Sequence, residues 1–283
     1  MSNEVFAMFM DETMTYSCAL FKARIDSKHE VLDIGCGWGT FAIEVVKQTG
    51  CKYTGITLSK EQLKFAEVKV MEAGLQDRIR ILLCDYRELP DTTKYDRIIS
   101  WQVLLPPKYM SFNSIPHNEM IEHVGHEYME AFFGCCETLL AEDGLLVLQF
   151  ISIVEEQYDE LRRSPGFLRE YIFPGGCMPS LSRVTSAMAA ASRLCVEHVE
   201  NIGPHYYHTL RCWRKKFLKN QSKIDAMGFD ERFIRTWDYY FNYCAAGFKS
   251  YMLGDYQVVF SRPGNVEALG NPYKGFPSAH NAP

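Results

Sequence analysis

A short glycine-rich segment, VLDIGCGWGT at residues 31–40, carries the strongest chemical signal in the sequence. Asp33 ends an apolar run, and the three glycines that follow it permit a tight turn and the close approach of a ligand to the backbone. A helix that opens at Gly39 would offer free backbone N–H groups to an anion. The pattern therefore predicts a nucleotide-like ligand at the carboxyl end of a strand.

Two other interpretations of this loop stay open, a dinucleotide site and a purely structural turn. A nicotinamide enzyme usually has a third glycine spaced for the pyrophosphate and an acidic residue at the end of the second strand. The second strand here ends in GITLS at 55–59, without a carboxylate. The sequence therefore favours a ligand other than a dinucleotide, with the structural turn as the remaining alternative.

The elements that must position this loop alternate between strand and helix. The clearest helix is 59–73, where Ser59 and Gln62 have the spacing of a capping box and Gly74 suits the left-handed cap at the end. Short β-branched runs predict strands at 29–35, 52–58, 78–85, 95–101 and 144–152. This alternation predicts a parallel sheet of the α/β class.

After residue 150 aromatic residues are interleaved with basic ones. Strands at 195–202 and 255–262 could extend the same sheet, and the helices between them would cover its edge. Those helices are expected at 182–194, 208–223 and 230–249. The segment 265–283 is rich in Asn, Gly and Pro and predicts a flexible tail.

Composition excludes several classes of function. The 283 residues are 47% hydrophobic, which excludes a disordered chain, and a formal net charge of −5 disfavours a nucleic-acid partner. Ten cysteines without a CxxC pair are typical of a reducing compartment. The longest apolar run, 145–154, is too short to cross a bilayer, and the acidic start differs from a secretory signal. A cytoplasmic protein is expected.

No metal is expected, because His123, His126 and His205 have no carboxylate or cysteine at ligand spacing.

Several motifs resemble one family of enzymes. DIGCGWGTFAIEV at 33–45 and GITLSKEQ at 55–62 resemble the first motif and the following strand of S-adenosylmethionine-dependent methyltransferases, specifically of the cyclopropane fatty acid synthase family. FMDETMTYSCA at 9–19, YIFPGG at 171–176 and PHYYHTLRCW at 204–213 resemble plant-type members. The resemblance extends up to Gly264.

This resemblance implies a Rossmann-like class I methyltransferase sheet with helices on both faces and a helical substrate cover. One methyltransferase domain is then expected at 29–264, of which 150–250 is a mostly helical acyl cover. A cofactor-closing helical segment would precede it at 1–28. The implied cofactor is S-adenosyl-L-methionine, and the implied partners are phospholipid acyl chains at a membrane surface.

The resemblance also implies the cofactor contacts. Tyr16 and Ser17 would close over the sulfonium, and Asp85 and Tyr86 would flank the adenine. The ribose side would be held by Thr57, Leu58 and Gln62, although helix capping alone would also explain Gln62. The methionine part would lie against Asp33, Gly35, Cys36, Gly37, Trp38 and Gly39.

The implied reaction transfers a methyl group to a cis double bond and then removes a proton to close a cyclopropane ring. An alkene is a weak nucleophile, so the site needs a dry apolar slot, groups that stabilise positive charge, and a base. In the family the base is thought to be bound bicarbonate. Its ligands would be Cys18, Glu122, Gln149, the carbonyl of Ile151, and Tyr206. Taken singly, each of them could be structural.

The sequence departs from the family pattern in three places. Gln149 stands where the family has a histidine, and an amide cannot carry a proton. Only twelve residues separate Cys18 from Val31, where the family has a further helix, and 101–118 is an insertion before Glu122. Because these changes lie at the edge of the site, a cofactor-binding protein with weak or no turnover is one alternative. A small-molecule amine N-methyltransferase with Glu122 as its base is another.

Residues 211–223 hold six basic side chains and no acidic one, together with Trp213, Phe217 and Leu218. A helix of this kind could lie on anionic lipid, each basic residue contributing about 1 kcal/mol near the surface. Weak vesicle binding that fades with salt, and hence a peripheral membrane location, would follow. The alternative is the solvated face of a covering helix.

Overall fold

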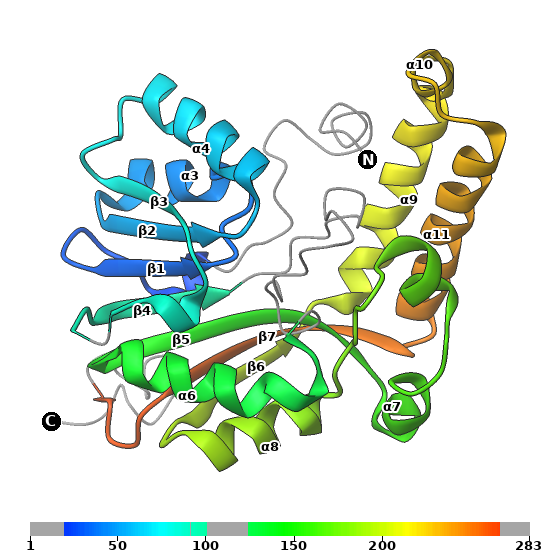
Figure 1. The fold of residues 1–283 in the computed structure, drawn as a ribbon. Coiled ribbons are helices and arrows are strands. Elements are labelled where there is room, and N and C mark those ends of the chain that lie inside the picture. Colours follow the sequence, from blue (N-terminus) through cyan, green and yellow to red (C-terminus); the bar gives the residue numbers. More distant parts are fainter. Residues whose placement is uncertain (1–19, 91, 101–123, 267–283) are drawn as a thin grey trace, which may run out of the picture.

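The computed structural model describes residues 20–90, 92–100 and 124–266, and its centre is a seven-stranded sheet in the order β3-β2-β1-β4-β5-β7-β6 (Figure 1). Strands β1 to β5 pair in parallel, whereas β7 is antiparallel to both β5 and β6. The strands are β1 (Glu30–Ile34), β2 (Lys52–Thr57), β3 (Ile79–Leu83), β4 (Tyr95–Ser100), β5 (Leu140–Ile153), β6 (Cys195–Asn201) and β7 (Leu253–Ser261). The predicted α/β sheet is confirmed.

Helices lie on both faces of this sheet, and a separate pair stands beyond its edge (Figure 1). The helices are α2 (Leu20–Ala23), α3 (Thr40–Thr49), α4 (Lys60–Glu72), α6 (Met129–Leu139), α7 (Glu155–Leu161), α8 (Leu181–Ala191), α9 (Gly203–Lys219), α10 (Gln221–Ala226) and α11 (Glu231–Lys249). Short turns of helix are η1 (Tyr86–Glu88), η3 (His126–Tyr128) and η4 (Leu168–Ile172). Of the expected segment at 1–28, the structure describes α2 and the residues up to the first strand.

Three apolar clusters hold these layers together. One lies between the sheet and α3 and α4, around Val45 and Ala66, and a second lies on the opposite face against α6 and α8, around Phe133. The third is separate from the sheet faces and joins α9, α11, α7 and η4 around Phe217 and Phe241. This third core is the predicted helical cover, and it places α9 and α11 beyond the carboxyl edge of the sheet (Figure 1).

The predicted helix at 208–223 differs from the observed one at both ends. Helix α9 starts at Gly203, because Pro204 fits the first turn, where no backbone donor is needed. The chain then leaves the helix at Asn220 (φ −97°, ψ 12°), and α10 begins one residue later. The predicted helix at 182–194 ends early, at Ala191, because Ser192 is extended.

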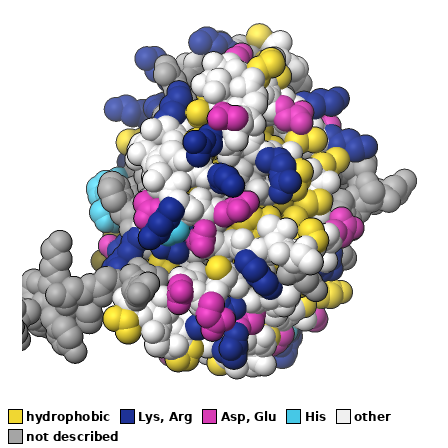
Figure 2. All heavy atoms as spheres, turned by 90° about the vertical axis from the view of Figure 1, so that its left-hand side faces the viewer, with side chains coloured by type: hydrophobic (Ala, Val, Ile, Leu, Met, Phe, Trp, Pro, Cys, Tyr) yellow, Lys and Arg dark blue, Asp and Glu magenta, His cyan; other side chains and the backbone are white. Residues whose placement is uncertain are grey.

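Of the predicted tail at 265–283, the structure describes Asn265 and Val266. Asn265 is buried, and its side-chain amide donates to the carbonyl of Gly144 at 3.3 Å, so it is part of the folded domain. Residues 267–283 lie outside the described part of the chain. On the surface shown in Figure 2, acidic and basic side chains are interspersed without a continuous patch of either sign.

Candidate active site

The glycine loop folds back onto the neighbouring strand. The backbone N–H groups of Gly35 and Cys36 both donate to the carbonyl of Ile56 at 3.0 Å. Gly39 caps α3 with φ +74°, and a Cβ there would lie 2.8 Å from the Cβ of Ala66 on α4. A side chain at this position would therefore push α4 away from the loop, which explains the need for glycine.

Asp33 is the buried acid at the start of this loop. Its Oδ2 accepts a hydrogen bond from the hydroxyl of Tyr53 at 2.7 Å, whereas its Oδ1 has no hydrogen-bond partner in the described part of the protein. Burial raises the pKa of Asp33 to about 7, although the Tyr53 hydrogen bond opposes this. A buried acceptor without a partner costs free energy, so this atom suits a cationic or donor group of a ligand.

Gln62 presents the complementary feature, a buried donor. Its Oε1 accepts from the Thr57 hydroxyl at 2.6 Å, while its Nε2 has no hydrogen-bond partner among the described residues. The predicted capping box is therefore only half correct. Ser59 caps the Gln62 N–H, but the Gln62 side chain binds Thr57, and the Ser59 N–H donates to the Thr57 hydroxyl. Capping alone does not explain this glutamine, and its free amide can donate to a ligand oxygen.

The two buried atoms without a partner among the described residues, Asp33 Oδ1 and Gln62 Nε2, show which chemical groups a ligand must bring. Asp33 is the last residue but one of β1 and Thr57 ends β2, two strands that pair directly. A ligand with an amino group near Asp33 and hydroxyl groups near Gln62 would satisfy both atoms. S-adenosylmethionine carries an amino group and a ribose, so the residues present fit it, while the individual contacts stay predictions.

The predicted adenine contacts are already engaged by protein groups. Arg87 donates to Asp85 with Nε at 2.8 Å and with Nη2 at 2.6 Å. Tyr86 is buried against Phe132, with their ring centroids 5.5 Å apart. Trp38 is also buried, edge-on to Phe65, while Leu58 is half-buried. The roles of Asp85 and Tyr86 towards adenine stay predictions.

Four predicted site residues, Tyr16, Ser17, Cys18 and Glu122, lie outside the described residues. The other predicted catalytic residues come together. Gln149 Nε2 donates to the carboxylate of Asp255 at 3.1 Å and to the Tyr206 hydroxyl at 3.4 Å. Gln257 Nε2 donates to Gln149 Oε1 at 2.8 Å. All four side chains are buried, and they form what is called here the glutamine cluster: Gln149, Tyr206, Asp255 and Gln257.

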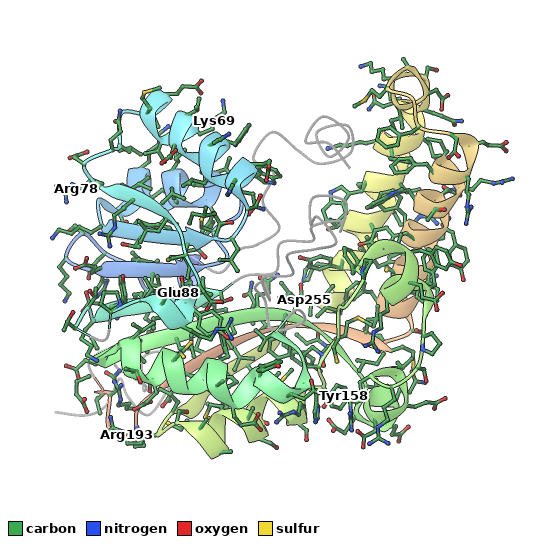
Figure 3. The ribbon with its side chains drawn as sticks, viewed as in Figure 1. Lys69, Arg78, Glu88, Tyr158, Arg193 and Asp255 are labelled. Atoms are coloured by element: carbon green, nitrogen blue, oxygen red, sulfur yellow. The ribbon has the colours of Figure 1, made fainter. Side chains whose placement is uncertain are left out.

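The parallel register places this cluster at the same edge as the glycine loop. Asp33 pairs with Ile99 on β4, and Ser100 pairs with Leu148 on β5, so Gln149 comes just past the end of β4. Neighbouring strands lie about 4.8 Å apart, which puts β5 about 10 Å from β1. Figure 3 shows Asp255 near the middle of the molecule, between the parallel strands and the helical cover.

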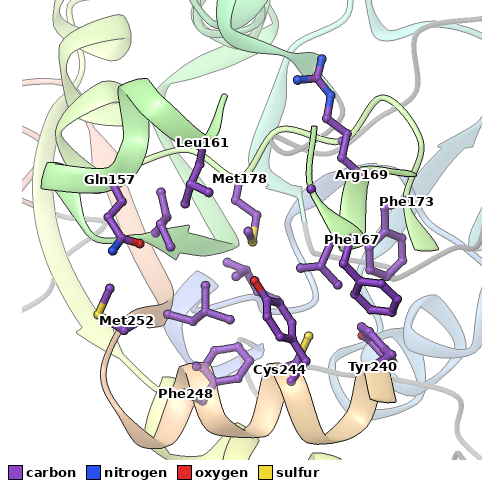
Figure 4. Close-up of a pocket in the computed structure, with 18 of the residues that line it drawn as sticks. Gln157, Leu161, Phe167, Arg169, Phe173, Met178, Tyr240, Cys244, Phe248 and Met252 are labelled. Atoms are coloured by element: carbon purple, nitrogen blue, oxygen red, sulfur yellow. The ribbon is translucent and has the colours of Figure 1, made fainter. Parts of the chain in front are cut away.

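Beyond the cluster, β5 continues past the edge of the sheet and forms one wall of a cavity of about 480 Å³ (Figure 4). Ile151 and Tyr206 line it, so the cavity starts beside the glutamine cluster. Most of its other walls are apolar or aromatic side chains of the cover, among them Phe167, Met178 and Phe248. The ring of Tyr206 stacks on that of Phe248 with centroids 5.3 Å apart. The cavity has the size and lining of a lipid-chain site.

The described part of the cluster does not support bound bicarbonate. The N–H groups of the Gln149 amide point at Asp255 and Tyr206 rather than towards an open anion site. Bicarbonate binding therefore stays a prediction.

The glutamine cluster predicts a stability effect. Gln257→Leu leaves the buried Oε1 of Gln149 without its donor, so we expect the free energy of unfolding to fall by about 1–3 kcal/mol. Urea unfolding measures this. The matched control is Gln48→Leu, which removes an exposed hydrogen bond to Glu44 on α3 and should change the free energy by less than about 0.5 kcal/mol. Equal losses in the two variants would contradict the role of the cluster.

The sequence analysis missed three residues of this site, Tyr53, Asp255 and Gln257. Asp255 and Gln257 alternate in the otherwise apolar strand DYQVVFSR, and two buried polar residues at that spacing face the same side of a sheet. This alternation could have indicated a polar cluster. Tyr53 gave no such signal, since a tyrosine in a strand is common.

A mostly parallel sheet of this order, with antiparallel β7 and a glycine loop after β1, is the fold of class I S-adenosylmethionine-dependent methyltransferases. The structure of the cyclopropane synthase MmaA2 from Mycobacterium tuberculosis matches it with a TM-score of 0.78 and 25% identity, over 93% of this chain and 95% of that one. Mycolic acid cyclopropane synthase CmaA1, complexed with SAH and CTAB, matches with a TM-score of 0.78 and 26% identity, over 92% and 94%.

The chain belongs to the mycolic acid cyclopropane synthetase family, whose sequence profile matches residues 22–258. This confirms the family that the motifs predicted, whereas the plant-type label stays a prediction. Tuberculostearic acid methyltransferase UfaA1 of M. tuberculosis is 32% identical over 93% of this chain. Cyclopropane-fatty-acyl-phospholipid synthase of Escherichia coli K12 is also 32% identical over 93% of it. Sphingolipid C9-methyltransferase 1 of Gibberella zeae is 31% identical over 90%. The chain covers 64%, 66% and 46% of these relatives.

Proposed function

We propose that this chain transfers a methyl group from S-adenosylmethionine to a cis double bond of a lipid acyl chain and that it forms cyclopropane fatty acyl groups on phospholipids. The observation that carries the proposal is the apolar cavity that begins at Ile151 and Tyr206, at the same sheet edge as the glycine loop.

The chain's own residues have separate tasks in this reaction. When bound, the cofactor supplies an electrophilic methyl group. Asp33 and Gln62 would hold it at the carboxyl ends of β1 and β2, through the two atoms that have no hydrogen-bond partner among the described residues. The cavity excludes water and aligns the double bond, which supplies the orientation that a weak nucleophile requires.

The aromatic walls of the cavity stabilise positive charge on the acyl chain. Tyr206 and Phe248 form a stacked pair that lines the cavity, and ring faces attract cations. Ring closure also requires a proton acceptor. Gln149 cannot hold a proton, but the Asp255 carboxylate in contact with it can.

The kind of lipid is part of the proposal. One relative is named for a phospholipid, another for tuberculostearic acid and a third for a sphingolipid. The predicted phospholipid substrate is retained because the motifs resemble the phospholipid enzymes.

Incubation with methyl-labelled S-adenosylmethionine tests the function. The purified chain is given vesicles of cis-unsaturated phospholipid, the same phospholipid with saturated chains, or a benzylisoquinoline amine. We expect label only in the unsaturated lipid, with mass spectrometry of the acyl chains showing one added CH₂ and no remaining double bond. Label in the amine would identify the rival N-methyltransferase. Cofactor binding by calorimetry without any product would identify the form without turnover.

Residues 211–223, where basic side chains are interspersed with Trp213, Phe217 and Leu218, predicted weak vesicle binding that fades with salt or, alternatively, the solvated face of a covering helix. Trp213 and Phe217 point into the core of the cover, where they are 8% and 0% exposed. The period of the helix turns these two rings inward, so they are buried in the protein. Salt-dependent binding through the exposed basic residues stays a prediction. Among the described helices, none is long and apolar enough to span a bilayer.

A further inference from the structure

The cavity reaches the surface between α7, η4 and α11. Leu161 and Tyr243 both line the cavity, and they are 41% and 46% exposed. The cavity therefore opens to solvent beside these two residues, and this opening is called its mouth. Figure 4 shows Leu161 and Phe167 from two different segments at this cavity. An acyl chain that enters the cavity must pass these side chains.

Exposed aromatic rings gather around the same mouth. Phe167 lies 4.7 Å from Tyr239, 5.8 Å from Tyr171 and 5.9 Å from Tyr243, measured between ring centroids. Tyr239 and Tyr243 also stack on each other at 5.7 Å. Tyr171 is 58% exposed and Tyr239 is 53% exposed. These residues are called here the aromatic rim: Leu161, Phe167, Tyr171, Tyr239 and Tyr243.

Folding alone does not account for the rim. Exposed large apolar side chains are ordinary when scattered, but a contiguous group around a cavity marks an interaction surface. Tyrosine suits the boundary between lipid and water, because its ring is apolar and its hydroxyl is polar. The rim thus has the chemistry of a surface that rests in the headgroup layer of a bilayer.

We infer that the aromatic rim docks on a phospholipid bilayer and delivers an acyl chain directly from it into the cavity. This inference rests on the proposed function, because the cavity must receive a chain that starts in a bilayer. A second copy of this chain fits the rim less well, since it would cover the mouth and close the path to the cavity.

The charges around the mouth indicate how the rim binds. Residues 155–170 contain five acidic and three basic side chains. Arg162 and Arg163 both lie against Asp159, at 2.7 Å and 3.6 Å. This part of the surface has no excess of positive charge to attract anionic lipid. Binding through the rim should therefore occur on neutral lipid and resist salt, unlike binding through 211–223.

Co-sedimentation of the whole chain with phosphatidylcholine vesicles, at low and high salt, tests this inference. We expect binding that changes by less than about twofold between the two salt concentrations. The triple variant Tyr171→Ser/Tyr239→Ser/Tyr243→Ser should bind about tenfold more weakly, because it removes exposed apolar area. The matched control, Lys215→Ser/Lys216→Ser/Lys219→Ser, replaces three exposed residues of α9 and should bind like the parent.

Three outcomes would overturn the inference. The first is that the tyrosine variant binds vesicles as well as the parent does. The second is that the lysine variant loses binding and that binding of the parent is sensitive to salt. The third is that the tyrosine variant differs from the parent in oligomeric mass, measured by light scattering. Turnover of lipid dispersed in detergent micelles gives a second readout, which the double variant Tyr171→Ser/Tyr239→Ser should retain, because neither of these residues lines the cavity. Vesicle binding is measured without turnover. A parent that binds through the rim but never methylates lipid would therefore refute the proposed function and leave the docking surface standing.

Discussion

Replacing Asp33 by asparagine should weaken S-adenosylmethionine binding by about 10- to 100-fold, since a hydrogen bond to a charged group contributes about 1.5–3 kcal/mol. The carboxylate Oδ1 is the buried acceptor that has no partner among the described residues. An amide at this position keeps the shape but loses the negative charge that attracts a cofactor amino group. Titration calorimetry measures the affinity.

The same variant should be the more stable protein at neutral pH when no cofactor is present. The pKa of Asp33 is about 7 in the folded state, against 3.8 as the reference value. Below pH 4 the carboxyl is protonated in both states and has no effect. Between pH 4 and pH 7 the unfolded state releases the proton and the folded state keeps it, so folding stability falls as pH rises. The accumulated cost is about 4 kcal/mol above pH 7.

Thermal or urea unfolding at several pH values checks the sign. The difference in unfolding free energy between Asp33→Asn and the parent should grow from pH 4 to pH 7 and then level off. Asp77→Asn is the matched control, because the Asp77 side chain is 77% exposed. This variant should change neither the affinity for S-adenosylmethionine nor the pH dependence of the unfolding free energy. If Asp33→Asn binds the cofactor as tightly as the parent does, Asp33 does not contribute to cofactor binding.

Filling the cavity should separate lipid turnover from cofactor binding. Met178 lines the cavity and is only partly exposed, and Figure 4 shows its side chain among the wall residues. Met178→Trp occupies space that an acyl chain needs. We expect turnover of unsaturated phospholipid to fall about 100-fold, as expected when a double bond is displaced by an ångström or more. The dissociation constant of S-adenosylmethionine should stay within about twofold of the parent.

The control for this variant is the same exchange on the surface. Met71 on α4 is 59% exposed, and Met71→Trp should leave both turnover and cofactor affinity unchanged. Circular dichroism at a range of temperatures tests whether Met178→Trp is folded. Normal lipid turnover by a folded Met178→Trp protein would show that the acyl chain binds elsewhere.

The predicted cofactor half of the site is local in the sequence. Asp33, the loop glycines, Thr57 and Gln62 all lie within 33–62, and short-range geometry sets what they do. Hydrogen bonds from Gly35 and Cys36 to Ile56 close the loop onto the next strand. A single βα unit and the following strand therefore define most of the cradle.

The acyl half depends on contacts that span long distances along the chain. Gln149 meets Asp255 across 106 positions and Gln257 across 108, because β7 returns antiparallel to β5. The resemblance implied that Gln149 stands where the family has a histidine, yet the sequence could not show which carboxylate lies beside it. Similarly, the composition of 211–223 left open a membrane-contacting helix or the solvated face of a covering helix, and only packing against α11 shows that its rings are buried.

By itself the sequence determined the alternating strands and helices, the glycine loop after β1 and the family, because local propensity, turn geometry and motif order are properties of contiguous residues. The tertiary structure decided the partners of Gln149, the cavity beyond the sheet edge and the aromatic rim at its mouth. Each of these is formed by side chains from separate elements, and only the packing of those elements sets which side chains meet and which stay exposed to solvent.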